Sequence, residues 1–239
     1  MSYLGSKGGS WILPAIVASM PPHDVYIETH LGSGAVMLAK PPAAVQIGID
    51  LDPELILANA GSGLFSGVCE LRFDDCIRFL ERFEFAGRRV LVYADPPYVI
   101  STRTSSARYA FDYTDADHRR LIAVLRQIPA DVILSGYPSE LYDELVGDWR
   151  SMELPAMTRG GPRIEKLWFS FPAGEVQWAT FAGENRTQRQ RIKRKAARWR
   201  AMYRELPPGE RLAVLAALLE EHAQKGAQDL ADVCDYGAP

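Results

Sequence analysis

Short apolar runs alternate with amphipathic segments over the first 171 residues. The runs are rich in valine, isoleucine and aromatic residues, which predicts buried strands over residues 25–28, 45–49, 71–73, 90–94, 131–135, 149–154 and 166–171. The segments between them predict helices over residues 11–20, 35–40, 77–83, 115–127 and 139–146. Alternating strands and helices predict an α/β fold, Rossmann-like, with a mostly parallel, doubly wound sheet.

The pattern changes after Phe181. Four apolar residues then recur at helical spacing, so that they form one stripe on a helix whose other faces are basic: Ile192, Ala196, Trp199 and Tyr203. Pro207-Pro208-Gly209 ends this helix, and residues 211–222 predict a second, leucine-rich helix. We therefore predict two domains, a catalytic domain over 1–175 and a basic helical extension over 176–239.

Charge is distributed unevenly. The net charge of the 239 residues is −3, yet residues 186–204 hold nine Lys or Arg and no acid, against 18 basic and 30 acidic residues elsewhere. Such a segment indicates contact with phosphates rather than only a solvated helix face. The DNA-binding residues predicted in it are Arg191, Lys193, Arg194, Lys195 and Arg198.

The remaining composition restricts the class of protein. Three cysteines without a Cys-x-x-Cys pair and four scattered histidines predict neither a disulfide framework nor a metal site. The longest apolar run, 212–219, is too short for a membrane span. Motif residues begin at Tyr3, so we expect no signal peptide and a reduced, cytoplasmic, metal-free protein.

Strand 90–94 ends at Asp95-Pro96-Pro97-Tyr98. The prolines stiffen this tetrapeptide and donate no hydrogen bonds, and ligands of open α/β sheets bind at the carboxyl ends of strands. Asp95 and the Pro96 carbonyl can each accept one hydrogen of an exocyclic amine while Tyr98 stacks on the ring that carries it. The alternative is a strand-end turn with an Asp cap and a packed tyrosine.

A second candidate site follows strand 25–28. Gly32-Ser33-Gly34 stands between this strand and a helix, which is typical of a turn where backbone approaches a ligand closely. Asp50 ends the next strand about 20 residues later, the usual spacing for an acid that binds ribose hydroxyls.

Two loops carry basic residues, and the first interleaves them with aromatic rings, which favours nucleic acid over a mobile solvated loop. Loop 99–113 contains Arg103 and Arg108 with Tyr109, Phe111 and Tyr113, and loop 155–163 contains Arg159 and Arg163. We expect both loops on the same rim as Asp95.

Together these motifs resemble those of the Dam-type DNA adenine methyltransferases, which transfer a methyl group from S-adenosylmethionine to adenine N6. The matching elements run in the family's order from residue 3 to about residue 171. They are Tyr3-Leu4-Gly5-Ser6-Lys7, Tyr26 to Gly34, Asp50, Asp75-Cys76, Asp95 to Tyr98, Thr114 to His118, and Leu134-Ser135-Gly136-Tyr137. The resemblance implies a class I methyltransferase fold with a seven-stranded sheet.

The resemblance also assigns roles. Tyr3 and Lys7 belong to the motif that meets the cofactor carboxylate, and Glu28 with Gly32 and Gly34 would hold its methionine part. Asp50 would bind the ribose, and Asp75-Cys76 the cofactor adenine. Asp95, Pro96, Pro97 and Tyr98 would hold an adenine flipped out of double-stranded DNA.

The chain departs from the family in two places. Thr29-His30 replaces the usual Pro-Phe, so His30 would present an imidazole to the cofactor. Asp75 and Asp95 lie close in sequence, without the substantial target-recognition insertion of larger members. Sequence reading is then left to the two basic loops, the helical extension, or a partner subunit in a homodimer.

Other substrates remain open. Cytosine N4 and RNA adenine also offer an exocyclic amine, and Asp95 favours adenine over cytosine. Glutamine methylation in a protein is disfavoured, because that family has Asn in place of Asp95. A non-catalytic DNA-binding subunit would predict damage to the motifs, which are intact.

Overall fold

The computed structural model describes residues 12–65, 69–102, 111–158, 161–173 and 186–218. The chain divides into two compact units, residues 1–182 and 183–239, which are treated separately below.

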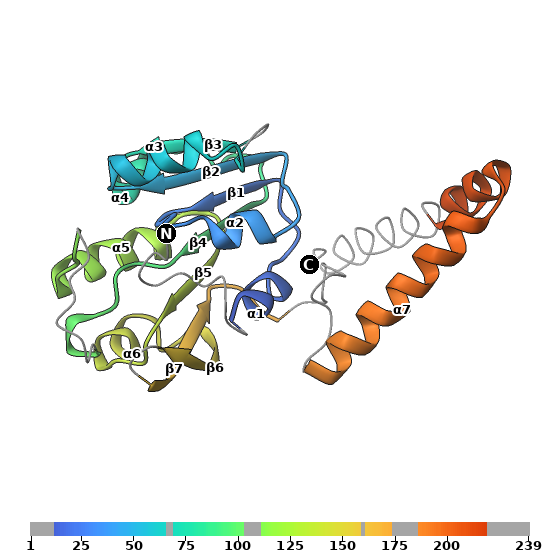
Figure 1. Ribbon diagram of the computed structural model, residues 1–239. Coiled ribbons are helices and arrows are strands. Elements are labelled where there is room, and N and C mark those ends of the chain that lie inside the picture. Colours follow the sequence, from blue (N-terminus) through green and yellow to red (C-terminus); the bar gives the residue numbers. More distant parts are fainter. Residues whose placement is uncertain (1–11, 66–68, 103–110, 159–160, 174–185, 219–239) are drawn as a thin grey trace, which may run out of the picture. The chain divides into compact units, whose positions relative to one another are not determined.

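The first unit is built on one seven-stranded sheet (Figure 1). Its strands are β1 Val25–Glu28, β2 Val45–Asp50, β3 Cys69–Phe73, β4 Val90–Ala94, β5 Asp131–Gly136, β6 Arg150–Thr158 and β7 Gly161–Phe169. Their spatial order is β3-β2-β1-β4-β5-β7-β6, in which β7 pairs antiparallel with β5 and β6 and the other pairs are parallel. The order reverses between β1 and β4, where open sheets bind ligands. The predicted fold class, a Rossmann-like α/β fold with a mostly parallel seven-stranded sheet, is confirmed.

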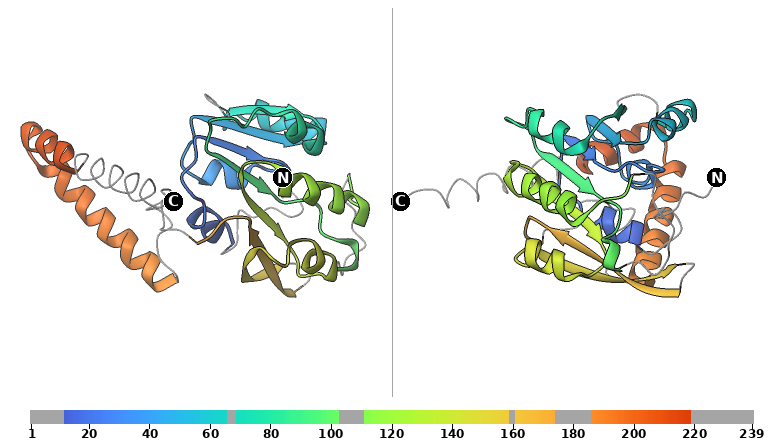
Figure 2. Two further views of the ribbon diagram at one scale, coloured as in Figure 1. Left: turned by 180° about the vertical axis from the view of Figure 1, so that it is seen from behind. Right: turned by 90° about the vertical axis from the view of Figure 1, so that its left-hand side faces the viewer.

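Helices cover both faces of the sheet (Figure 2). They are α1 Ile12–Ala18, α2 Ala35–Ala39, α3 Pro53–Gly61, α4 Cys76–Arg82, α5 Asp115–Gln127 and α6 Glu140–Val146, with a 3-10 turn at Ile100–Thr102. One core cluster packs α4, α5 and α6 on one face, and the other packs α1, α2 and α3 on the opposite face. Alternate residues of the central strands enter the two clusters, as Val92 and Tyr93 do.

The sequence did not predict two features of this unit. Helix α3 follows β2, and its start is marked by Asp52, whose side chain caps it, and by Pro53 in its first turn. Segment 155–163, expected as a loop, mostly continues β6 and β7 as an antiparallel hairpin in which Thr158 pairs with Gly161. That expectation was wrong, because the two strands pair with each other beyond the end of β5.

The second unit contains α7 Arg186–Glu205 followed by helical residues 208–218. The predicted basic helix and the break near Pro207 are confirmed. None of the helices in the described part of the chain is long and apolar enough to cross a membrane.

Candidate active site

Asp95 lies directly after β4, at the carboxyl rim of the sheet, where β5 holds its carboxylate. In the parallel pairing Ala94 faces Leu134, which places Asp95 beside Ser135. The Ser135 hydroxyl, fully buried, donates to Asp95 Oδ1 over 2.7 Å, and Ser135 Oγ lies 3.1 Å from the Tyr93 hydroxyl. The carboxylate is therefore oriented by the neighbouring strand.

Tyr98 is held at its edge and on one face. Its hydroxyl lies 3.1 and 3.2 Å from the two carboxylate oxygens of Glu165, to which it donates. Glu165 is a β7 residue that is 2% exposed. The ring of Tyr137 stacks on Tyr98 with centroids 4.1 Å apart. Three adjacent strands thus fix the position of one tyrosine.

The Gly32–Gly34 turn has the left-handed backbone that only glycine adopts easily, with φ of 52° at Gly32 and 64° at Gly34. A Cβ on Gly34 would also collide with the Phe65 ring. Gly34 is the N-cap residue of α2, so the turn brings backbone to the rim. The observed turn matches the predicted one.

Asp50 ties this turn to β2. Its two carboxylate oxygens accept from the backbone N–H of Gly32 over 2.9 Å and of Asp52 over 3.0 Å. Asn59 Nδ2 donates to the Gly32 carbonyl over 2.9 Å, which fixes the other side of the turn. Burial raises the pKa of Asp50, and the backbone donors oppose that shift.

Glu28 ends β1 and is 3% exposed. Burial raises the pKa of Glu28 to about 8, and the nearby Asp95 charge adds to the shift. The Tyr26 hydroxyl donates to Glu28 Oε2 over 2.9 Å and opposes it. Because the charge of Asp95 raises the pKa of Glu28, the residue predicted to bind the cofactor lies near the residue predicted to bind the base.

A buried lysine lies behind this carboxyl group. Lys40 Nζ is 4.4 Å from the centre of the Tyr26 ring and donates to the Pro41 carbonyl and to Gln46 Oε1. Burial lowers the pKa of Lys40 to about 8, while Glu28 favours its charged form. The sequence pattern did not point to Lys40 as part of this network.

His30 lies in a polar cluster rather than alone. Its Nδ1 is 2.9 Å from Thr29 Oγ1 and its Nε2 is 3.0 Å from the Tyr113 hydroxyl. Cys76 Sγ lies 3.8 Å from His30 Nε2 and 3.6 Å from the Tyr113 hydroxyl. Burial lowers the pKa of His30 to about 3 and raises the pKa of Cys76 to about 12, so both side chains are neutral.

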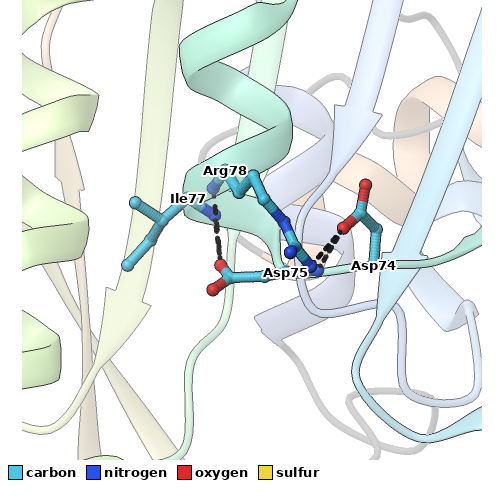
Figure 3. Close-up of polar contacts among 4 residues, drawn as sticks. All are labelled: Asp74, Asp75, Ile77 and Arg78. Atoms are coloured by element: carbon cyan, nitrogen blue, oxygen red, sulfur yellow. Dashed lines mark hydrogen bonds and ion pairs between the residues drawn. The ribbon is translucent and has the colours of Figure 1, made fainter.

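Asp75 begins α4 as its N-cap residue (Figure 3). Its Oδ1 accepts from the backbone N–H of Ile77 over 2.9 Å and of Arg78 over 3.5 Å. Asp74 pairs with the Arg78 guanidinium over 2.9 Å, which holds the turn before the helix. The capping bonds use one oxygen of Asp75, and a carboxylate has acceptor positions on both.

Several predicted residues lie outside the described residues: Tyr3, Lys7, Arg103, Arg108, Tyr109 and Arg159. Of the others in the two loops, Phe111 is exposed and Arg163 is half-buried on β7. Tyr113 is 7% exposed and packs in the core against His30, so the prediction that its ring faces nucleic acid was wrong. Sequence pattern could not predict this burial, because aromatic rings are common both in cores and at nucleic-acid interfaces.

Helix α7 presents the predicted cations around its apolar stripe. At roughly 100° per residue, Arg191, Lys195 and Arg198 lie on one side of the stripe, and Lys193 and Arg200 on the other. All five are exposed, and none of the cations among the described side chains of α7 is in an ion pair. Among the described side chains of this helix, the positive charge is therefore not compensated by ion pairs.

Comparison with known proteins adds weak similarity. No protein-family model and no curated protein sequence matches the chain. It resembles the solved structure of a precorrin-8W decarboxylase from Methanobacterium thermoautotrophicum with 12% identity and a TM-score of 0.45, covering 72% of this chain and 93% of that one.

Two further solved structures are similar to the same degree. A SAM-dependent methyltransferase from Agrobacterium tumefaciens is 15% identical with a TM-score of 0.46, covering 66% of this chain and 59% of that one. A dimethyladenosine transferase from Plasmodium falciparum is 16% identical with a TM-score of 0.43, covering 66% and 60%. The chain spans less than two thirds of both, and similarity this weak identifies no substrate.

Proposed function

We propose that this chain is an S-adenosylmethionine-dependent methyltransferase that modifies the exocyclic N6 amine of adenine in double-stranded DNA. The observation that carries the proposal is the Asp95–Tyr98 segment at the carboxyl end of β4. There Asp95 is oriented by the buried Ser135 and Tyr98 by the buried Glu165. A strand-end turn without a ligand needs neither contact.

The residues at the rim fit the cofactor. Gly32 and Gly34 form a left-handed turn at the rim, Asp50 offers lone pairs for ribose hydroxyls, and Asp75 offers its second oxygen to an adenine amine. Glu28 lies at the end of β1 beside them. When bound, S-adenosylmethionine would supply a methyl group on a sulfonium, whose neutral thioether is a good leaving group.

The chain's own part in the reaction is positioning. Asp95 and the Pro96 carbonyl each accept a hydrogen bond from one N–H of the amine, so that the nitrogen lone pair is less delocalised into the ring. Tyr98 stacks on the base. An adenine within a duplex cannot reach such a pocket, so the nucleotide flips out first. Orientation of the two reactants in this way can contribute most of the rate acceleration.

Two features favour DNA adenine. Asp95, rather than serine, before Pro-Pro-Tyr favours adenine over cytosine, as the family resemblance implies. The exposed cations of α7 supply the sequence-independent attraction to phosphates that nucleic-acid binding needs.

The test is transfer of labelled methyl from S-adenosylmethionine to unmethylated genomic DNA, followed by nucleoside analysis. We expect N6-methyladenine with the wild-type protein and at least a hundredfold less with Asp95→Ala, because the amine loses an acceptor that orients it. Cofactor binding, measured by calorimetry, should persist in the variant.

Glu153→Ala is the matched control, since Glu153 is an exposed carboxylate on β6. It should methylate as the wild type does. N4-methylcytosine, or product on RNA alone, would change the substrate in this proposal. Full turnover by Asp95→Ala would overturn the mechanism.

A further inference from the structure

Tyr98 and Glu165 make a polar contact at the carboxyl rim of the sheet. Glu165 is a carboxylate that is 2% exposed, and burying a carboxylate is costly unless it is hydrogen-bonded. The Tyr98 hydroxyl lies 3.1 and 3.2 Å from its two oxygens and donates to them. A phenylalanine at 98 and an apolar residue at 165 would fill the same space without that cost.

The two residues come from strands that are not neighbours. β5 separates β4 from β7 in the sheet, and the pairing of Gly136 with Lys166 places Glu165 near Tyr137, just beyond the end of β5. Tyr98 therefore reaches across the end of β5 to Glu165. Glu165 thus holds the hydroxyl edge of the Tyr98 ring, and Tyr137 packs against one face of it.

Tyr137 covers one face of Tyr98. Ring centroids 4.1 Å apart are in direct contact, whereas a base inserted between two rings requires about 7 Å, twice the stacking distance of nucleic-acid bases. A base that stacks on Tyr98 therefore uses the face opposite Tyr137. Tyr137 supports the ring from behind.

We propose that Glu165 is a positioning residue for the target base, acting through the Tyr98 hydroxyl, with Tyr137 as the support behind the Tyr98 ring. Asp95 and the Pro96 carbonyl set where the amine lies, while Glu165 and Tyr137 set the plane of the ring that carries it. This inference rests on the proposed function.

A cycle of two substitutions tests it on the full chain, with methyl transfer to duplex DNA as the assay. Tyr98→Phe removes the hydroxyl and keeps the ring, and Glu165→Ala removes the acceptor. Each should lower kcat/KM by roughly tenfold to a hundredfold, the range expected for a hydrogen bond to a charged group. Because both break one contact, the double variant should be no worse than the poorer single variant.

Conservative variants distinguish positioning from folding. Glu165→Gln retains an oxygen acceptor and should recover part of the loss seen with Glu165→Ala. Tyr137→Ala removes the supporting ring and should raise KM for DNA, whereas Tyr137→Phe keeps the ring and should recover most of that loss. The affinity for S-adenosylmethionine should stay within twofold in every variant, since none of these residues lies at the Gly32–Gly34 turn.

The outcomes separate this inference from the proposed function. Losses that multiply in the double variant, or a lower KM for DNA with Tyr137→Ala, would overturn the inference while methylation by the wild type stands. A wild-type protein that binds the cofactor and methylates no nucleic acid would overturn the proposed function, and the inference with it.

Discussion

His30 stands where the family resemblance leads us to expect a phenylalanine, and its contacts explain how an imidazole is accommodated. Thr29 Oγ1 donates to the Tyr93 carbonyl, so it can accept from His30 Nδ1–H, and the Tyr113 hydroxyl can donate to His30 Nε2. A neutral ring satisfies all three contacts. Protonation would add an N–H at Nε2, to which the Tyr113 hydroxyl could then no longer donate, and would bring a charge into this buried cluster. Burial disfavours that charge and so lowers the pKa of His30.

This residue predicts a difference in acid sensitivity. The pKa of His30 is about 3 in the folded protein, below the ordinary value of 6.5. As the pH falls from 6.5, the unfolded chain takes up the proton first, so the free energy of unfolding decreases. This uptake makes the free energy of unfolding fall by at most about 1.4 kcal/mol per pH unit, and His30→Phe removes that contribution.

Urea unfolding at pH 7, 6 and 5 measures the effect. We expect His30→Phe to be less stable than the wild type at pH 7, where it loses the Thr29 and Tyr113 contacts, and to close that gap at pH 5. His23→Phe is a comparison outside the site. Burial also lowers the pKa of His23, to about 4, so this variant should lose the same kind of pH dependence. Wild-type and His30→Phe curves that stay parallel would show that His30 titrates normally in the folded chain.

At the scale of elements, the N-cap residue of α4, Asp75, both stabilises the helix and belongs to the candidate site. Asp75→Ala removes the cap and should lower the free energy of unfolding by about 1 kcal/mol. If Asp75 also meets the cofactor adenine, the same substitution weakens S-adenosylmethionine binding. Asp75→Asn keeps the cap and should restore stability, while affinity recovers less because the amide lacks the carboxylate's charge.

Ser139→Ala is the matched control, because Ser139 caps α6 by accepting from Tyr142 N–H over 3.2 Å. It should reduce stability by a similar amount without changing cofactor affinity. Thermal unfolding and calorimetry on the three variants separate the two roles. Equal cofactor affinity in Asp75→Ala and the wild type would leave Asp75 as a cap alone.

The elements also show what the sequence could predict. β1 and α5 were predicted to the residue, because an apolar run bounded by polar residues and a capping box are local signals. Strands were predicted over residues 149–154 and 166–171, but the extension of β6 and β7 through residues 155–158 and 161–163 was missed, since it depends on the pairing of the two strands with each other. For the same reason Glu165 and Lys40 carried no signal: their roles arise only where other strands and rings meet them.

At the scale of the whole molecule, stability and charge are divided between the two units. Every residue of the two buried core clusters lies between Ile12 and Phe169, within the first unit. The densest positive charge lies in α7, in the second unit. Substitutions on α7 can therefore remove positive charge without disturbing the core that carries the site.

The last prediction uses this division. Four exposed cations of α7 are replaced by alanine together: Arg191, Lys193, Arg194 and Lys195. If all four contact phosphates, the slope of log affinity for duplex DNA against log salt should fall by about 3 to 4, since each contact contributes about 0.9. The control removes the same charge from the first unit by replacing Arg72, Arg89, Arg119 and Arg126, whose exposed ion pairs contribute little stability. Fluorescence anisotropy with a labelled duplex at roughly 50 to 200 mM salt gives both slopes.

Equal slopes for the two variants would mean that net charge alone attracts DNA, whereas a drop confined to the α7 variant would make that helix the phosphate-binding element.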